Sequence, residues 1–328
     1  MDERFLIHMV RILNHTLALL RLLRWPNLLI VAASQVLIRE CVLVPMLKRA
    51  HMEPQLTPGL FIFLVLATVF ITAGGYAIND YFDRKLDRVN RPQALIVGRL
   101  IYPRHAMAYH LFFSIIGVIM GCWVAFRSGQ LYLGLVFFMV SGLLWFYSTT
   151  YKRELILGNI IVALMTALVP FLVLLFELPL LARNYGSDVS PLTKFLLIWV
   201  LGFSLFAFLV NLTREIVKDA EDFEGDEAYG KRTIPVVWGM PAARWITAAI
   251  ILLTVVMLLI AWMLFIPDTI TLLYFIVALI IPLLYVIFVL FRYLDRNSWH
   301  RASNVLKLIM LAGLGYMVVV NLVINSMS

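Results

Sequence analysis

The sequence has few charged residues. Only 14% of its 328 residues are Asp, Glu, Lys or Arg, whereas soluble globular domains contain about 25%. Hydrophobic residues make up 62% of the chain, and the mean hydropathy is +0.93. This composition excludes an ordinary soluble domain and indicates an integral membrane protein.

Cysteine is almost absent. The two cysteines, Cys41 and Cys122, are too few for a disulfide framework or a cysteine-based metal site. The six histidines show no metal-ligand spacing. We also find no cleavable signal peptide, because the N-terminal residues carry acidic side chains and lack a small-residue cleavage site.

Acidic residues are outnumbered by basic ones, which gives a formal net charge of +8. In a soluble protein this excess would suggest a nucleic-acid partner. In a membrane protein it is the expected result of placing Lys and Arg in cytoplasmic loops. We therefore predict no nucleic-acid partner.

Long apolar runs dominate what is present, and each is near the roughly 20 residues that a spanning helix needs. They predict an all-α, polytopic protein of about nine transmembrane helices within a single domain over residues 1–328. The nine runs lie near residues 17–38, 59–79, 106–126, 131–148, 155–176, 195–212, 245–266, 269–291 and 305–324. Before the first of them, residues 1–24 mix apolar with basic positions and predict a helix lying at the membrane interface.

The basic residues are distributed unevenly among the loops. With a cytoplasmic N-terminus, the inner loops hold most of the Lys and Arg, and the last run ends in an uncharged tail. This bias predicts the N-terminus inside and the C-terminus outside. Two long loops, residues 80–105 and 213–244, are then cytoplasmic.

The first of these loops opens with an acidic cluster. If the preceding helix continues, Asn79, Asp83 and Asp87 lie four residues apart on one face, with Asp80 beside them. Closely spaced carboxylates repel one another unless a cation lies between them, and Mg²⁺ prefers such oxygen ligands. The alternative is a solvated helix end, because four basic residues are interleaved.

The second loop repeats the arrangement. Glu215, Asp219, Asp222 and Asp226 are spaced by four, three and four residues and are predicted to form one helical stripe, with Lys218 on an adjacent one. Two solvated loops explain this poorly, because ten of the 19 acidic residues fall in the two stretches: Asp80, Asp83, Asp87, Glu215, Asp219, Glu221, Asp222, Glu224, Asp226 and Glu227.

Two acidic clusters on one membrane face suit a diphosphate ligand. A diphosphate cannot approach bare carboxylates, but Mg²⁺ ions bridge the two, and Lys and Arg neutralise the remaining charge. Cleaving a carbon–oxygen bond to diphosphate requires such stabilisation of the leaving group. The surrounding membrane suits an isoprenoid tail.

The motifs resemble those of a known family. The first reads Asn79-Asp80-x-x-Asp83-x-x-x-Asp87-x-x-Asn90-Arg91-Pro92 and looks like the first motif of the UbiA-type intramembrane prenyltransferases. The second, Arg-Glu-Ile-x-Lys-Asp-x-x-Asp-x-x-Gly-Asp from residue 214, is most similar to that of the digeranylgeranylglyceryl phosphate synthases. Further matches are Arg24-Trp-Pro-Asn27, Tyr151-Lys152-Arg153, Gly158-Asn159 and Lys231-Arg-Thr-Ile-Pro235.

The resemblance implies a helical bundle around a central cavity and Mg²⁺-dependent transfer of a prenyl group, here geranylgeranyl, from a prenyl diphosphate donor to a lipid-like acceptor such as geranylgeranylglyceryl phosphate. It implies metal binding by Asn79, Asp83, Asp87, Glu215, Asp219 and Asp222. It implies substrate binding by Arg24, Asn27, Asp80, Asp87, Arg91, Lys218, Asp222 and Asp226. The residues expected to carry catalysis are Asn79, Asp83, Asp219, Lys152 and Tyr147.

Two departures bear on the acceptor. Residues 93–97 read Gln-Ala-Leu-Ile-Val, where many members of the family have a second Arg-Pro followed by Pro-Ser-Gly. Glu215 stands where several members have Asp. An aromatic acceptor, such as 4-hydroxybenzoate or a quinone precursor, therefore stays open as an alternative.

A cation-coupled membrane transporter is a rival of another class. It would place carboxylates in the middle of the membrane and interrupt its helices, whereas the acidic clusters here lie at helix ends. The sequence therefore favours the transferase, embedded in the cytoplasmic membrane with its active site on the cytoplasmic face.

Overall fold

The computed structural model describes residues 13, 15–90, 92–293 and 295–326. Arg91, predicted to bind substrate, lies outside the described residues. Most of the predicted interfacial helix over residues 1–24 lies outside them as well, and its position at the membrane interface stays a prediction. Residues 15–22 are helical.

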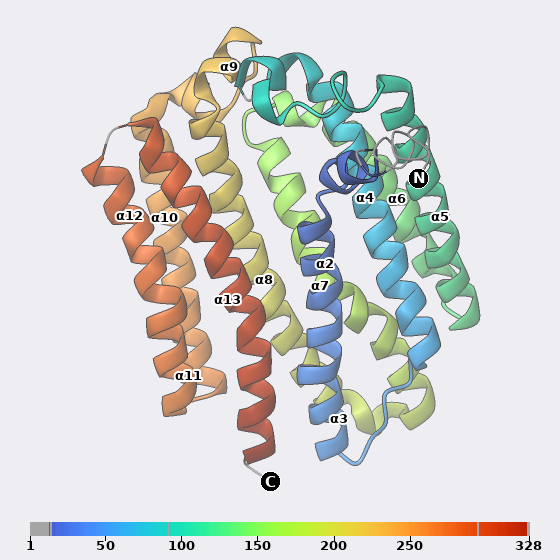
Figure 1. Cartoon of the computed structure of the whole chain (residues 1–328). Coiled ribbons are helices and arrows are strands. Elements are labelled where there is room, and N and C mark those ends of the chain that lie inside the picture. Colours follow the sequence, from blue (N-terminus) through green and yellow to red (C-terminus); the bar gives the residue numbers. More distant parts are fainter. Residues whose placement is uncertain (1–12, 14, 91, 294, 327–328) are drawn as a thin grey trace, which may run out of the picture. The chain divides into compact units, whose positions relative to one another are not determined.

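The described part of the chain is helical and contains no strand, which confirms the all-α prediction (Figure 1). Within it, nine helices are long and apolar enough to cross a membrane. They are Trp25–Arg49, Pro58–Val89, Pro103–Arg127, Leu131–Thr149, Leu157–Tyr185, Ser190–Glu221, Ile234–Phe265, Thr269–Arg292 and Arg296–Asn325.

The first spanning helix begins later than predicted. It runs without a break through α2 (Trp25–Leu37), the π-helical η1 (Ile38–Leu43) and α3 (Val44–Arg49). Arg24 has a left-handed backbone (φ 51°), which ends the preceding helix because an L-residue cannot continue a right-handed helix in that conformation. The prediction of a span over residues 17–38 was therefore wrong in its bounds.

Much of the two predicted loops is helical. Helix α4 (Pro58–Asn90) continues through the first acidic motif, and η2 (Pro92–Ala94) and α5 (Pro103–Arg127) follow it. Helix α8 (Ser190–Glu221) likewise continues into the second motif, whose last residues lie on α9 (Phe223–Ala228), and α10 (Ile234–Phe265) follows. Both motifs therefore sit on rigid backbone.

The chain forms two compact units. The first comprises residues 1–32 and 59–151 and contains α4, α5, η3 (Leu131–Leu133) and α6 (Gly134–Thr149). Helices α4 and α5 approach closely at Gly74, where an added Cβ would lie 2.5 Å from the Ser114 hydroxyl oxygen. Small residues thus allow the tight helix contact that membrane proteins favour.

The second unit comprises residues 33–58 and 152–328. Helix α8 packs against α7 (Leu157–Tyr185), α10 and α13 (Arg296–Ser326), as Figure 1 shows. Helix α12 (Ile281–Arg292), reached through α11 (Thr269–Tyr274) and η6 (Phe275–Ile280), packs against α10 and α13. Two short turns, η4 (Tyr151–Arg153) and η5 (Gly186–Val189), flank α7. A single prenyltransferase domain over the whole chain stays a prediction.

Buried charge holds the segment between the first two spans. Glu177, inside α7, is 3% exposed and accepts the backbone N–H groups of Gln55 and Leu56. Arg39, 6% exposed, donates to the Leu56 carbonyl at 2.7 Å. Glu177 accepts hydrogen bonds from two backbone N–H groups that would otherwise lack an acceptor, so its role is structural.

Replacing Glu177 by Ala should destabilise the protein by about 3 kcal/mol, because two backbone donors lose their acceptor and the buried Arg39 cation loses a neighbouring negative charge. The midpoint of thermal unfolding in detergent should fall. Glu53→Ala is the matched control in the same segment, since the Glu53 side chain is exposed. An equal change in both variants would contradict the structural role of Glu177.

Candidate functional site

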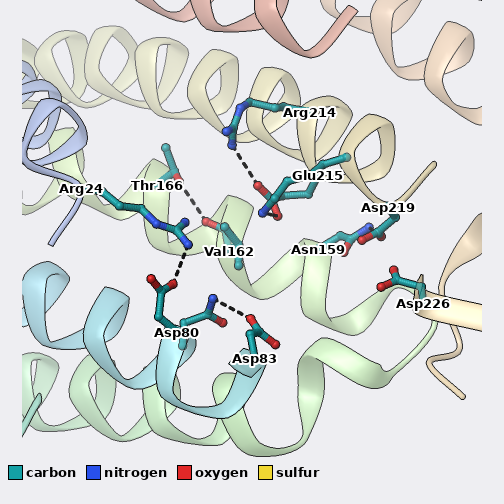
Figure 2. A network of polar contacts seen from close by, with 12 residues as sticks. Arg24, Asp80, Asp83, Asn159, Val162, Thr166, Arg214, Glu215, Asp219 and Asp226 are labelled. Carbon is teal, nitrogen blue, oxygen red and sulfur yellow. Dashed lines mark hydrogen bonds and ion pairs between the residues drawn. The ribbon is translucent and has the colours of Figure 1, made fainter. Parts of the chain in front are cut away.

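The first cluster lies in the first unit and comprises Arg24, Tyr76, Asn79, Asp80 and Asp83. Arg24 Nη2 donates to Asp80 Oδ1 at 2.8 Å (Figure 2). The Arg24 guanidinium lies 5.0 Å from the centre of the Tyr76 ring. The Asp80 side chain is only 11% exposed. A buried carboxylate needs such a partner, because the charge would otherwise be costly to remove from water.

The backbone explains how Arg24 reaches this place. Its left-handed φ separates the helix ending at residue 22 from α2, and its carbonyl accepts the Asn27 N–H at 2.8 Å. Burial alone would lower the pKa of Arg24, but the charge and hydrogen bond of Asp80 together with neighbouring Tyr76 and Asp83 outweigh it and raise that pKa. Arg24 is therefore a fixed cation, and half-buried Asn27 lies one turn away.

Asn79 and Asp83 form a pair on one face of α4. Asn79 Nδ2 donates to Asp83 Oδ2 at 2.9 Å. The other amide atom, Asn79 Oδ1, is buried and accepts no hydrogen bond from the described residues. An orphaned oxygen beside a carboxylate is a donor set that suits Mg²⁺. Asp87 follows one turn later and is half-buried.

The second cluster lies in the second unit and contains Asn159, Glu215, Asp219, Asp226 and Lys231. Asn159, 9% exposed near the start of α7, donates from Nδ2 to Asp219 Oδ2 on α8 at 2.8 Å (Figure 2). This bond joins residues 60 positions apart in the chain and fixes one carboxylate oxygen. The other oxygen keeps its capacity for a ligand.

Glu215 has two cationic neighbours on its own helix. Arg214 Nη1 lies 3.0 Å from Glu215 Oε1, and Lys218 Nζ lies 3.5 Å from Oε2. The Glu215 side chain is 9% exposed. The acidic residue thus holds two basic groups at the end of α8, where they can neutralise a phosphate.

The predicted acidic stripe does not continue to Asp226. Helix α8 ends at Glu221, and half-buried Asp222 lies at the junction with α9. Asp226 is fully buried, and its Oδ1 lies 2.9 Å from Lys231 Nζ. The single stripe over four acidic residues was therefore a wrong prediction, because the helix is interrupted and Asp226 serves an internal ion pair.

Two further predicted residues, Tyr147 and Lys152, lie on α6 and in η4. Both are half-buried. The neighbouring Arg153 carbonyl accepts the Arg232 N–H at 3.0 Å, which ties η4 to the segment after α9. Contact of Tyr147 or Lys152 with a substrate stays a prediction.

Three contributors were not among the predicted site residues: Asn159, Arg214 and Lys231. Asn159 and Lys231 stand in motifs that support the family resemblance, but only their contacts show what they do. An uncharged Asn in an apolar helix is a weak signal by itself. Its spacing to Asp219 along the chain gives no indication that the two side chains meet.

A bound metal would not be held by protein alone. Among the described residues, no group of three His, Cys, Asp or Glu side chains gathers closely enough to hold a metal ion. Mg²⁺ commonly takes one or two carboxylates and completes its coordination with water and substrate phosphates. The Asn79–Asp83 pair fits that mode of binding.

The chain resembles known proteins in sequence. The model of the UbiA prenyltransferase family matches residues 42–311. The digeranylgeranylglyceryl phosphate synthase of Thermococcus kodakarensis is 30% identical over 260 residues, which cover 77% of this chain and 82% of that protein. The enzyme of the same name from Methanosphaera stadtmanae is 29% identical over 249 residues, covering 74% and 81%.

Solved structures share the fold. One is described as giving structural and mechanistic insights into the biosynthesis of digeranylgeranylglyceryl phosphate synthase in membranes. It aligns with a TM-score of 0.63 at 22% identity and covers 94% of this chain and 98% of that one. A UbiA homolog from Archaeoglobus fulgidus bound to DMAPP and Mg²⁺ aligns with a TM-score of 0.57 at 19% identity, covering 92% and 98%.

Proposed function

Because the chain belongs to the UbiA prenyltransferase family, we propose that it transfers a geranylgeranyl group from geranylgeranyl diphosphate to geranylgeranylglyceryl phosphate. The choice of acceptor rests on one observation. Relatives that match about three quarters of this chain are named digeranylgeranylglyceryl phosphate synthase. Their product contains two such groups on a glyceryl phosphate, so the second transfer fits this donor and acceptor.

The reaction exchanges one carbon–oxygen bond for another. The bond between the allylic C1 of the donor and its diphosphate breaks, and the diphosphate leaves with the electron pair. The acceptor hydroxyl oxygen forms a new ether bond to C1, and its proton is released. The main demand on the protein is therefore to stabilise charge on the leaving diphosphate.

The described residues meet that demand with fixed cations and oxygen ligands. Arg214 and Lys218 are held by Glu215 at the end of α8, and Arg24 is held by Asp80. The Asn79–Asp83 pair, Asp219 and Glu215 supply oxygen ligands for Mg²⁺, which when bound would neutralise phosphate charge. That both clusters bind the same diphosphate stays a prediction from the sequence.

The chain is an integral membrane protein, and its orientation is part of the proposal. The Lys and Arg bias of its loops supports a cytoplasmic N-terminus and a cytoplasmic active site in the cytoplasmic membrane. A cytoplasmic site is consistent with a water-soluble diphosphate headgroup reaching it from that side.

The relatives support neither of the two alternatives, an aromatic acceptor and a cation-coupled transporter. An aromatic acceptor would require relatives that prenylate rings, whereas the two quoted above carry the name of a lipid synthase. A cation-coupled transporter is not favoured, since the family that the chain belongs to consists of prenyltransferases.

The test is turnover by the purified protein in detergent. It should form digeranylgeranylglyceryl phosphate from geranylgeranyl diphosphate, geranylgeranylglyceryl phosphate and Mg²⁺, as read by mass spectrometry. EDTA should abolish the product. A product formed only with 4-hydroxybenzoate or a quinone precursor would replace the lipid acceptor by an aromatic one, and no product with any acceptor would refute the proposal.

A further inference from the structure

A buried amide nitrogen on α8 has no hydrogen-bond partner among the described residues. Asn211 is only 4% exposed, and its Nδ2 donates no hydrogen bond to any described residue. Burying an amide without a hydrogen bond costs on the order of 1–3 kcal/mol in a protein. A bound ligand that accepts the hydrogen bond of Asn211 Nδ2 would explain why this group is buried.

The position of Asn211 is informative. It precedes Glu215 by four residues, so the two positions share one face of α8 and lie about 6 Å apart along the helix axis. Glu215 and the cations it holds lie near the end of the helix, and Asn211 lies closer to its middle. The amide is thus on the membrane side of the groups proposed to neutralise the diphosphate.

A second polar atom on this face is also without a partner. The Ser204 side chain, seven residues before Asn211, is 6% exposed, and its hydroxyl makes no hydrogen bond to the described residues. By contrast, buried Thr213 donates to the Leu209 carbonyl at 2.8 Å, the usual arrangement for a hydroxyl in a helix. The face with Ser204 and Asn211 therefore differs from its neighbours on the same helix.

We infer that the Asn211 amide binds the oxygen-bearing headgroup of the acceptor, a lipid alcohol, and thereby positions its hydroxyl. This inference rests on the proposed function. In a displacement, the attacking oxygen lies on the side of C1 away from the diphosphate, about 3 Å from C1 when poised to react. An uncharged group that both donates and accepts suits a neutral hydroxyl and its neighbouring ether oxygen.

Asn211→Leu separates this role from a structural one, since Leu has a similar volume and lacks the polar atoms. We expect the KM for the acceptor to rise about tenfold, the loss of one hydrogen bond to a ligand, with the KM for geranylgeranyl diphosphate unchanged. Thermal stability without ligands should stay equal or rise, because an unpaired buried polar group is removed. The matched control, Thr213→Val, should leave both KM values unchanged.

Thermal shifts give a readout that does not depend on turnover. The acceptor should stabilise the wild-type protein and Thr213→Val but not Asn211→Leu, while an unreactive thiolo analogue of the donor with Mg²⁺ should stabilise all three. Reduced stability or misfolding of Asn211→Leu would show that the amide supports the fold and overturn the inference. So would an acceptor shift retained in that variant or missing in the wild type. A wild-type protein that binds the acceptor without turnover would instead refute only the proposed function.

Discussion

Replacing Asp83 by Asn is expected to lower kcat/KM for prenyl transfer by about 10²–10³-fold, the usual cost of losing one group that stabilises transition-state charge. The structural reason is the pair on α4: Asn79 Nδ2 donates to Asp83 Oδ2, and the buried Asn79 Oδ1 beside it is the oxygen proposed as the second metal ligand. In Asp83→Asn the pair of residues 79 and 83 has no negative charge left to attract Mg²⁺. Steady-state kinetics with both substrates and varied Mg²⁺ would measure the effect.

The dependence of activity on Mg²⁺ concentration shows whether Asp83→Asn loses activity through weaker metal binding. Residual activity of Asp83→Asn should need more Mg²⁺ than the wild-type protein, because a neutral amide binds the cation more weakly. Lys85→Ala is a control from the same turn of α4, where the side chain is exposed, and should behave as wild type. Unchanged kcat/KM and Mg²⁺ dependence in Asp83→Asn would remove Asp83 from the proposed metal site.

Replacing Asp219 by Asn should cause a loss of similar size, about 10²–10³-fold in kcat/KM. Asn159 donates to one oxygen of Asp219 and so orients the other. A second amide at residue 219 would bring two amides together and remove the negative charge. The purified variant would be compared with the wild type for product formation and for its thermal unfolding midpoint, which should be nearly unchanged.

Asn159→Leu tests the orienting bond separately. Groups that orient a metal ligand typically contribute 10–100-fold to activity or metal affinity, so this variant should be less impaired than Asp219→Asn. Exposed Glu227, acidic and in the same loop region, offers the matched control, and Glu227→Gln should retain full activity. If Asn159→Leu lost more activity than Asp219→Asn, Asn159 would have a role beyond orienting Asp219.

The membrane architecture could be predicted from the sequence because hydrophobic length is a local property. Each spanning helix needs about 20 apolar residues whatever its neighbours, and the runs in the sequence located the nine candidate spans found among the described residues. The bounds failed where tertiary contacts intervene. Arg39 lies inside the first span and donates to the Leu56 carbonyl, and the sequence does not show that contact.

The candidate site was predicted in part. The spacing of Asn79 and Asp83 gives one helical face, and the structure joins them by a hydrogen bond. The same reasoning failed for Asp226, because a periodic pattern assumes one continuous helix, whereas α8 ends at Glu221. The prediction also left out Asn159, whose chemistry becomes visible only through its bond to Asp219.

The sequence by itself determined the class of protein, the number of spans and the two acidic motifs at helix ends, because hydrophobicity and helical spacing act over a few turns of chain. The tertiary structure decided which side chains meet: the ion pairs Arg24–Asp80 and Lys231–Asp226, and the hydrogen bond from Asn159 to Asp219. It also left the buried Asn211 Nδ2 without an acceptor in the part of the chain that the structure describes. These outcomes depend on which helices pack together, because burial and hydrogen bonding depend on distance in space, and no local pattern encodes it.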